Sequence, residues 1–103
     1  MHLPRIERNT LGAEIDQTFL AVLELIFQAC FAGDRFEKLS RVSSAIAKAD
    51  LVKFLLQLGW EGKLIDHKLY GVLLLDLDEV GRMLGGWKRM LSNKTPARER
   101  EKS

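Results

Sequence analysis

The sequence is poor in cysteine, proline and tyrosine, and each shortage excludes a class of fold. One cysteine in 103 residues cannot form an internal disulfide, and it excludes zinc modules built on several cysteines. Two prolines and one tyrosine argue against a β-sandwich or barrel, which needs many turns and strand-forming aromatic residues. The length allows one domain and disfavours two.

Long apolar runs are also missing. The longest, over residues 19–32, is interrupted by Glu24, Gln28 and Cys30, and it falls short of the roughly 20 residues that a membrane-spanning helix needs. The first ten residues are polar and charged, where a secretory signal would be apolar. We therefore expect a cytoplasmic protein with no membrane partner. In that compartment the Cys30 thiol should be reduced. Because Cys30 lies within an apolar run and no base lies near it in the sequence, we expect it to be buried and unreactive.

The net charge of +2 is small but unevenly distributed. Residues 88–103 include six basic and two acidic residues, whereas the first 87 include ten basic and twelve acidic ones. The last eleven residues contain no large apolar side chain, and Pro96 should interrupt any helix there. We therefore predict a helical domain over residues 1–92 and a basic, flexible tail over residues 93–103.

Apolar residues that recur every three or four positions predict three helices, over residues 10–32, 36–60 and 66–92. The first helix has two apolar stripes, one of Leu11, Ile15, Phe19, Val22, Ile26 and Cys30, the other of Leu20, Leu23, Phe27 and Phe31. Together they form a face wider than one partner helix usually covers. The short connections favour antiparallel neighbours, so the predicted fold class is an all-α antiparallel helical bundle.

Three glycines, Gly81, Gly85 and Gly86, lie inside the third predicted helix. Each costs about 1 kcal/mol relative to alanine in a helix interior. Because Trp87 and Leu91 continue the apolar pattern beyond them, we expect the helix to persist. The glycines would then let another backbone, or the Trp87 ring, approach closely.

Residue patterns that carry catalysis or hold metals are absent from the sequence. His2 and His67 have no histidine or cysteine at metal-ligand spacing. No phosphate-binding loop, nucleophile elbow or dinucleotide fingerprint is present, nor the Arg-before-His pattern of small helical ribonucleases of the HEPN type. Asp78 precedes Arg82 by four residues, which predicts an ion pair on one helix rather than a general acid. We expect no enzyme activity, no metal and no cofactor.

Basic residues are better candidates for function. Arg41 and Lys48 lie seven residues apart, as do Arg82 and Arg89, so each pair shares one helix face. Such residues can neutralise the phosphates of a nucleic acid, although a merely solvated face remains the alternative. A ring of subunits would repeat each cation and concentrate the positive potential.

Two stretches resemble a known family. LPRIERNTLG (residues 3–12), followed by Ile15-Asp16, and DEVGRMLGGW (residues 78–87) are similar to segments of small bacterial four-helix-bundle proteins. That family includes the accessory variability determinant proteins of diversity-generating retroelements and proteins encoded in intervening sequences of ribosomal RNA genes. The GRMLGGW string is closer to the retroelement branch. The resemblance covers residues 3–91, most of the chain.

The resemblance implies a four-helix bundle that assembles into a ring-shaped homopentamer. It also implies a protein that is not catalytic, binds the reverse transcriptase of the element and template RNA or DNA, and so supports mutagenic retrohoming. The chain departs from the family in two places. Ala13-Glu14 stands where a basic residue is usual, and the family's first helix, which precedes the Pro4 loop, has no counterpart after Met1. Either that helix is lost or Met1 is an internal start.

These patterns give two candidate surfaces. The nucleic-acid-binding residues would be Arg5, Arg8, Arg41, Lys48, Arg82, Lys88, Arg89, Arg98 and Arg100, and the oligomer interface would include Leu20, Leu23, Phe27, Phe31 and Trp87. Two other functions stay open: an intervening-sequence protein of undefined role and a purely structural helical oligomer.

Overall fold

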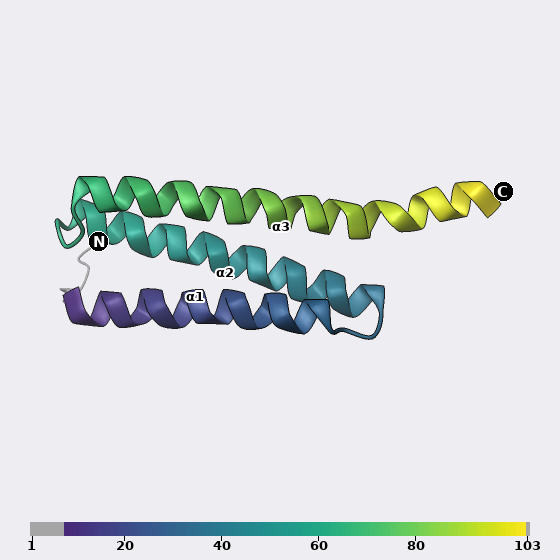
Figure 1. Ribbon diagram of the computed structural model, residues 1–103, viewed down its shortest axis with the longest axis horizontal. Helices are drawn as coiled ribbons and strands as arrows, with labels where there is room; N and C mark the ends of the chain where they lie inside the picture. Colours follow the sequence, from purple (N-terminus) through teal and green to yellow (C-terminus); the bar gives the residue numbers. More distant parts are fainter. Residues whose placement is uncertain (1–7, 103) are drawn as a thin grey trace, which may run out of the picture.

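The chain folds into three consecutive α-helices. The computed structural model describes the backbone of residues 8–102 and the side chains of residues 9–93. Helix α1 spans Arg8–Cys30, α2 spans Arg35–Glu61 and α3 spans His67–Lys102, and no strand occurs within this part of the chain. The predicted all-α class is confirmed. Neighbouring helices run antiparallel, as the short connections predicted (Figure 1).

A capping residue and a lysine fix the turn between α1 and α2. The Asp34 carboxylate accepts a hydrogen bond of 2.8 Å from the Glu37 N–H, which satisfies one of the free donors at the start of α2. The Lys38 ammonium donates to the Ala29 and Cys30 carbonyls at 2.9 and 3.2 Å. These carbonyls belong to the last turn of α1, where no further helical turn supplies donors. The Ala29 carbonyl also accepts a weaker bond of 3.4 Å from the Ala32 N–H. The end of α1 and the start of α2 are thus each stabilised by side-chain hydrogen bonds from residues in or next to this turn.

The turn between α2 and α3 folds back onto Gly59. The Gly59 carbonyl accepts hydrogen bonds from the N–H groups of Leu64 and Ile65, at 2.7 and 3.1 Å. Lys63 adopts a positive φ of 62° to make this reversal. The Asp66 carboxylate then accepts a bond of 2.7 Å from the Leu69 N–H, which caps the start of α3.

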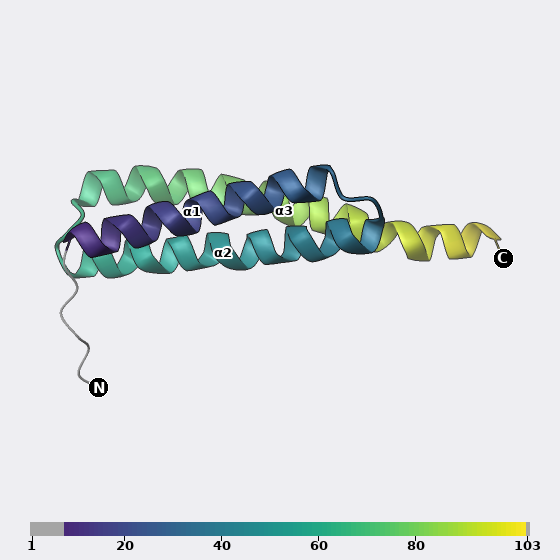
Figure 2. The same cartoon turned by 90° about the horizontal axis from the view of Figure 1, so that it is seen from below.

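Helix α2 contacts both other helices and lies between them in the view of Figure 1. Seen from below, α1 crosses in front of α3, so the three helices do not form one flat layer (Figure 2). Within the described residues, no Cα atom of α1 lies within 8 Å of one of α3. The fully buried side chains of α2 include Val42, Ala45, Ala49, Val52 and Leu56. They belong to two clusters, one with Val22, Ala29, Leu84 and Leu91 and the other with Leu77. The core is therefore built around α2, and α1 and α3 each keep an uncovered side.

The apolar face of α1 is wider than its partner covers, as the two stripes predicted. Leu11, Val22 and Ala29 are buried, whereas Phe27 is 63% exposed and Phe31 is 75% exposed. The three-helix arrangement buries Leu11 and Val22 of the first stripe, although Phe19 and Cys30 of that stripe are exposed, and it leaves the second stripe in solvent. The fourth helix and the ring-shaped assembly implied by the resemblance stay predictions.

The end of α3 differs from the prediction. We predicted that the helix ends at Ser92 and that Pro96 interrupts it, but α3 continues to Lys102 and extends beyond the ends of α1 and α2 (Figure 1). Proline removes one backbone donor, but its fixed φ is close to the helical value. The residues that follow, Ala-Arg-Glu-Arg-Glu-Lys, all have high helix propensity. The domain boundary at residue 93 and the flexibility of the tail stay predictions.

The glycines of α3 give a mixed result. The helix passes through Gly81, Gly85 and Gly86 without a break, so the predicted continuity is confirmed. The predicted close approach of another backbone is wrong within the described residues. The nearest atom to a Cβ built on Gly81 is Lys53 Nζ at an ordinary 3.9 Å, and apart from chain neighbours nothing lies within 4 Å of one built on Gly85 or Gly86. Neither glycine faces α2. The tightest contact at a glycine is at Gly59, near the end of α2.

Candidate nucleic-acid and protein interfaces

The basic surface of α3 is exposed. Arg82, Lys88 and Arg89 all lie in solvent, and none of them forms a salt bridge within 4 Å to a described side chain. Arg82 and Arg89 share one face, and Lys88 lies about 100° around the helix from Arg89. Three cations are thus available to an anionic ligand along two turns of α3.

The predicted Asp78–Arg82 ion pair is wrong. Asp78 instead pairs with Lys53 of α2, whose Nζ lies 3.4 Å from Asp78 Oδ1 and 3.6 Å from Asp50 Oδ1. The ammonium of Lys53 thus lies between Asp50 of its own helix and Asp78 of α3. A spacing rule for pairs on one helix does not predict the contact between helices. Arg82 is left without that partner.

The basic residues of α2 form a separate surface. Arg41 is half-buried, and its Nη2 lies 3.9 Å from Glu37 Oε1; Lys48 is exposed. Both side chains project about 120–140° around α2 from Lys53, which contacts α3. The structure therefore does not join Arg41 and Lys48 to the cations of α3.

The remaining predicted cations lie at the ends of the chain. Arg5 is outside the described residues, and Arg8 is the first residue of α1. Arg98 and Arg100 belong to the last turns of α3. The side chains of Arg8, Arg98 and Arg100 are outside the described part of the chain, so their roles stay predictions.

An apolar strip follows the outer side of α1. We call Leu20, Leu23, Phe27 and Phe31 the α1 stripe; all four are exposed, and the Phe27 and Phe31 ring centres lie 4.8 Å apart. Trp87, predicted in the same interface, is half-buried and packs against the core. It therefore belongs to a different part of the surface.

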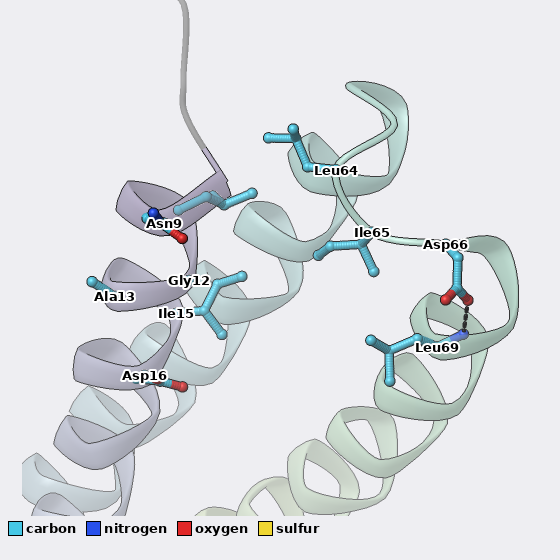
Figure 3. A pocket seen from close by; sticks show the side chains of 10 residues that line it. Asn9, Gly12, Ala13, Ile15, Asp16, Leu64, Ile65, Asp66 and Leu69 are labelled. Carbon is cyan, nitrogen blue, oxygen red and sulfur yellow. Dashed lines mark hydrogen bonds between the residues drawn. The ribbon is translucent and has the colours of Figure 1, made fainter.

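Between α1 and α3 runs a groove whose floor, in its middle part, is formed by Val52 and Leu56 of α2. Three hollows, of about 520, 290 and 240 Å³, follow one another along it. The first two share Ile15 and Asp16, and the last two share Val80, so the hollows adjoin one another. We call the three together the α1–α3 groove. In the first hollow, Ile15 of α1 points toward Ile65 and Leu69 on the other side (Figure 3). Trp87 and Met83 line the far end.

The lining of the groove is apolar and acidic. Its charged members are Asp16, Asp66 and Asp76, and no lysine or arginine with a described side chain lines any of the three hollows. Asp66 is engaged in capping α3, whereas Asp16 and Asp76 line the middle hollow from opposite helices. Sequence reasoning missed this site. The available signal was Asp76, which lies seven residues from the apolar Leu69 and Met83 and so shares their helix face.

Cys30 is exposed, so its predicted burial is wrong. Cys30 is the last residue of α1 and lies on the part of the apolar face that α2 does not cover. Among the side chains of residues 9–93, no three histidine, cysteine, aspartate or glutamate residues are placed to hold a metal ion. None of the three helices has a stretch both long and apolar enough to cross a bilayer within that part of the chain.

Comparison with known proteins yields no relative. No protein-family model, no curated protein and no solved structure matches the chain. The resemblance to accessory variability determinant proteins therefore rests on the two strings at residues 3–12 and 78–87.

Proposed function

We propose that the protein is a noncatalytic accessory protein of a bacterial diversity-generating retroelement. It acts in the cytoplasm, where it binds the reverse transcriptase and RNA or DNA and so supports mutagenic retrohoming. One observation carries the proposal: the string that resembles the family lies on α3, and Arg82 within it and Lys88 and Arg89 just after it are all exposed. Their positive charge is not neutralised by any described carboxylate within 4 Å.

The chemistry of this surface suits a phosphate backbone rather than particular bases. Each cation that contacts a phosphate releases a condensed counterion, so the affinity is independent of sequence and falls as salt is added. A homo-oligomer, a pentamer according to the resemblance, would repeat the three cations around its axis and raise the local potential. The α1 stripe, which is apolar and exposed, is the surface proposed to join the subunits.

Titration of labelled single-stranded RNA at several salt concentrations tests the proposal. We expect the logarithm of the binding constant to fall with the logarithm of salt, by about 0.7 per neutralised phosphate. Lys88→Gln/Arg89→Gln should weaken binding to unrelated RNAs alike and flatten this slope. Helicity should stay intact, because exposed charges contribute little to stability.

A matched control removes the same charge elsewhere. Lys63→Gln/Lys68→Gln changes two exposed lysines near the start of α3 and should leave the slope unchanged. If both double variants bind RNA as the parent does, Lys88 and Arg89 are not part of the site. If the parent shows no salt-dependent binding, the purely structural oligomer becomes the better proposal. A reverse transcriptase gene with template and variable repeats beside the coding sequence would separate the retroelement role from that of an intervening-sequence protein.

A further inference from the structure

The α1–α3 groove has the shape of a site for one more helix. Its lining runs from Leu11 to Ile26 on α1 and from Leu69 to Trp87 on α3, a length of about 25 Å at the rise of an α-helix. Its sides keep apart, because no Cα atom of α1 comes within 8 Å of one of α3 in the described residues. The floor includes Val52 and Leu56 of α2. A helix of about 15–18 residues would fill such a groove.

The charges of the groove restrict what can occupy it. Asp16 and Asp76 line its middle hollow from opposite sides, and no described lysine or arginine lines any hollow. A purely apolar helix, or an acidic one, would take these carboxylates out of water without a partner, which is costly. A helix with a cation on its apolar face would pair with them instead.

A second copy of α1 does not meet this requirement. Helix α1 contains Glu14, Asp16 and Glu24, and its one basic residue, Arg8, is at its first position. The middle and end of the α1 helix of another copy would therefore bring carboxylates toward carboxylates. Like charges placed together in an interface suppress association. The apolar stripe of α1 can therefore join subunits elsewhere, but it does not suit this groove.

We propose that the α1–α3 groove binds an amphipathic α-helix of a partner protein, and that this helix carries a lysine or arginine on its apolar face that pairs with Asp16 and Asp76. This is recognition of a helix in a groove, in which apolar anchors supply most of the affinity and the charge fixes register. The inference stands independently of nucleic-acid binding, because Arg82, Lys88 and Arg89 are not among the lining residues.

A pair of synthetic helical peptides tests the proposal on the intact protein. Each labelled 18-residue peptide has a leucine stripe on an alanine and glutamine background, with either one lysine or one glutamate in the middle of the stripe. Fluorescence anisotropy measures the affinity of each. We expect the lysine peptide to bind at least about tenfold more tightly than the glutamate peptide. In Asp16→Asn/Asp76→Asn the two affinities should become similar.

Two exposed apolar residues provide a matched pair of variants. Met83 is 69% exposed and lines the groove, whereas Leu75 is 71% exposed and does not. Met83→Gln should weaken both peptides, Leu75→Gln should weaken neither, and circular dichroism should show unchanged helicity in both. Equal affinity for the two peptides in the parent protein, or equal effects of the two variants, would overturn the proposal. A third result would also overturn the proposal: neither peptide binds, and Met83→Gln reduces self-association. A second copy of the chain would then occupy the groove.

Discussion

The contact at Gly59 predicts opposite effects of the same substitution at two glycines. A Cβ built on Gly59 would lie 2.6 Å from Ile65 Cδ1, 2.7 Å from Leu11 Cδ2 and 3.0 Å from Ile65 Cγ1. Nothing lies within 4 Å of a Cβ built on Gly86. Both glycines are helical, so the substitution by alanine changes helix propensity alike at the two positions and packing at only one.

The size of each effect follows from these distances. Alanine in place of glycine inside a helix gains about 1 kcal/mol, and Gly86→Ala should show that gain in full. At Gly59 the methyl of Leu11 can rotate away, but Ile65 Cγ1 cannot easily move, because the Ile65 N–H is bonded to the Gly59 carbonyl at 3.1 Å. Overpacking costs about 1–3 kcal/mol. The net change for Gly59→Ala should therefore lie between neutral and about 2 kcal/mol of destabilisation.

Urea unfolding followed by far-ultraviolet circular dichroism measures both variants. All samples need the same protein concentration, since self-association would add to apparent stability. The free energy of unfolding should be higher in Gly86→Ala than in Gly59→Ala by about 1–3 kcal/mol. Equal stabilisation in both variants would refute the close approach of α1 and the α2–α3 turn at Gly59. A destabilised but helical Gly86→Ala would show that another chain contacts α3 at this glycine.

Three further predictions follow from burial and exposure. Leu56 is 2% exposed and packs in the core of α2, so Leu56→Ala should lower the free energy of unfolding by about 2–5 kcal/mol in the same urea assay; a loss below 1 kcal/mol would contradict its burial. Cys30 is exposed, so a thiol reagent should modify the folded protein about as fast as the unfolded one, and a reaction limited by unfolding would show that the thiol is covered. Light scattering at micromolar concentration should show an oligomer that Phe27→Ser weakens more than the control Phe54→Ser on α2; a parent protein that is monomeric at every concentration would refute assembly through the α1 stripe.

The sequence was sufficient to predict the helices because each has its own apolar period and its own ends. The interior ends of the predicted helices fall within two residues of those in the structure. Asp66 was expected at the start of the third helix, and it caps α3 through the Leu69 N–H. Such features depend on residues close together in the chain. The end of α3 was missed because the helix-breaking tendency of Pro96 was given more weight than the propensity of the residues after it.

Features that depend on pairs of helices could not be predicted in the same way. Short connections indicate antiparallel neighbours, but they do not say that α1 and α3 stay apart. The partner of Asp78 was sought four residues away, at Arg82, whereas Lys53 reaches it from α2. Asp76 shares a helix face with Leu69 and Met83, but the groove that it lines is completed by residues of α1 and α2. In each case the deciding neighbour is distant in sequence.

The exposed apolar face of α1 is too wide for one partner helix to cover. The proposed subunit interface on the α1 stripe and the proposed peptide site in the α1–α3 groove can therefore lie on different parts of it. Phe19 lines the groove, whereas Phe27 and Phe31 lie about 80° and 120° farther around the helix. One docked helix covers a stripe of about 100°, so a helix that reaches into the groove beside Phe19 would leave the outer part of the α1 stripe free. Assembly and peptide binding should then respond to different substitutions. Phe27→Ser should reduce self-association and leave the preference for the lysine peptide unchanged. Asp16→Asn/Asp76→Asn should remove that preference and leave self-association unchanged. If either variant abolished both properties without loss of helicity, the two surfaces would be one, and the occupant of the groove would have to be another copy of the chain.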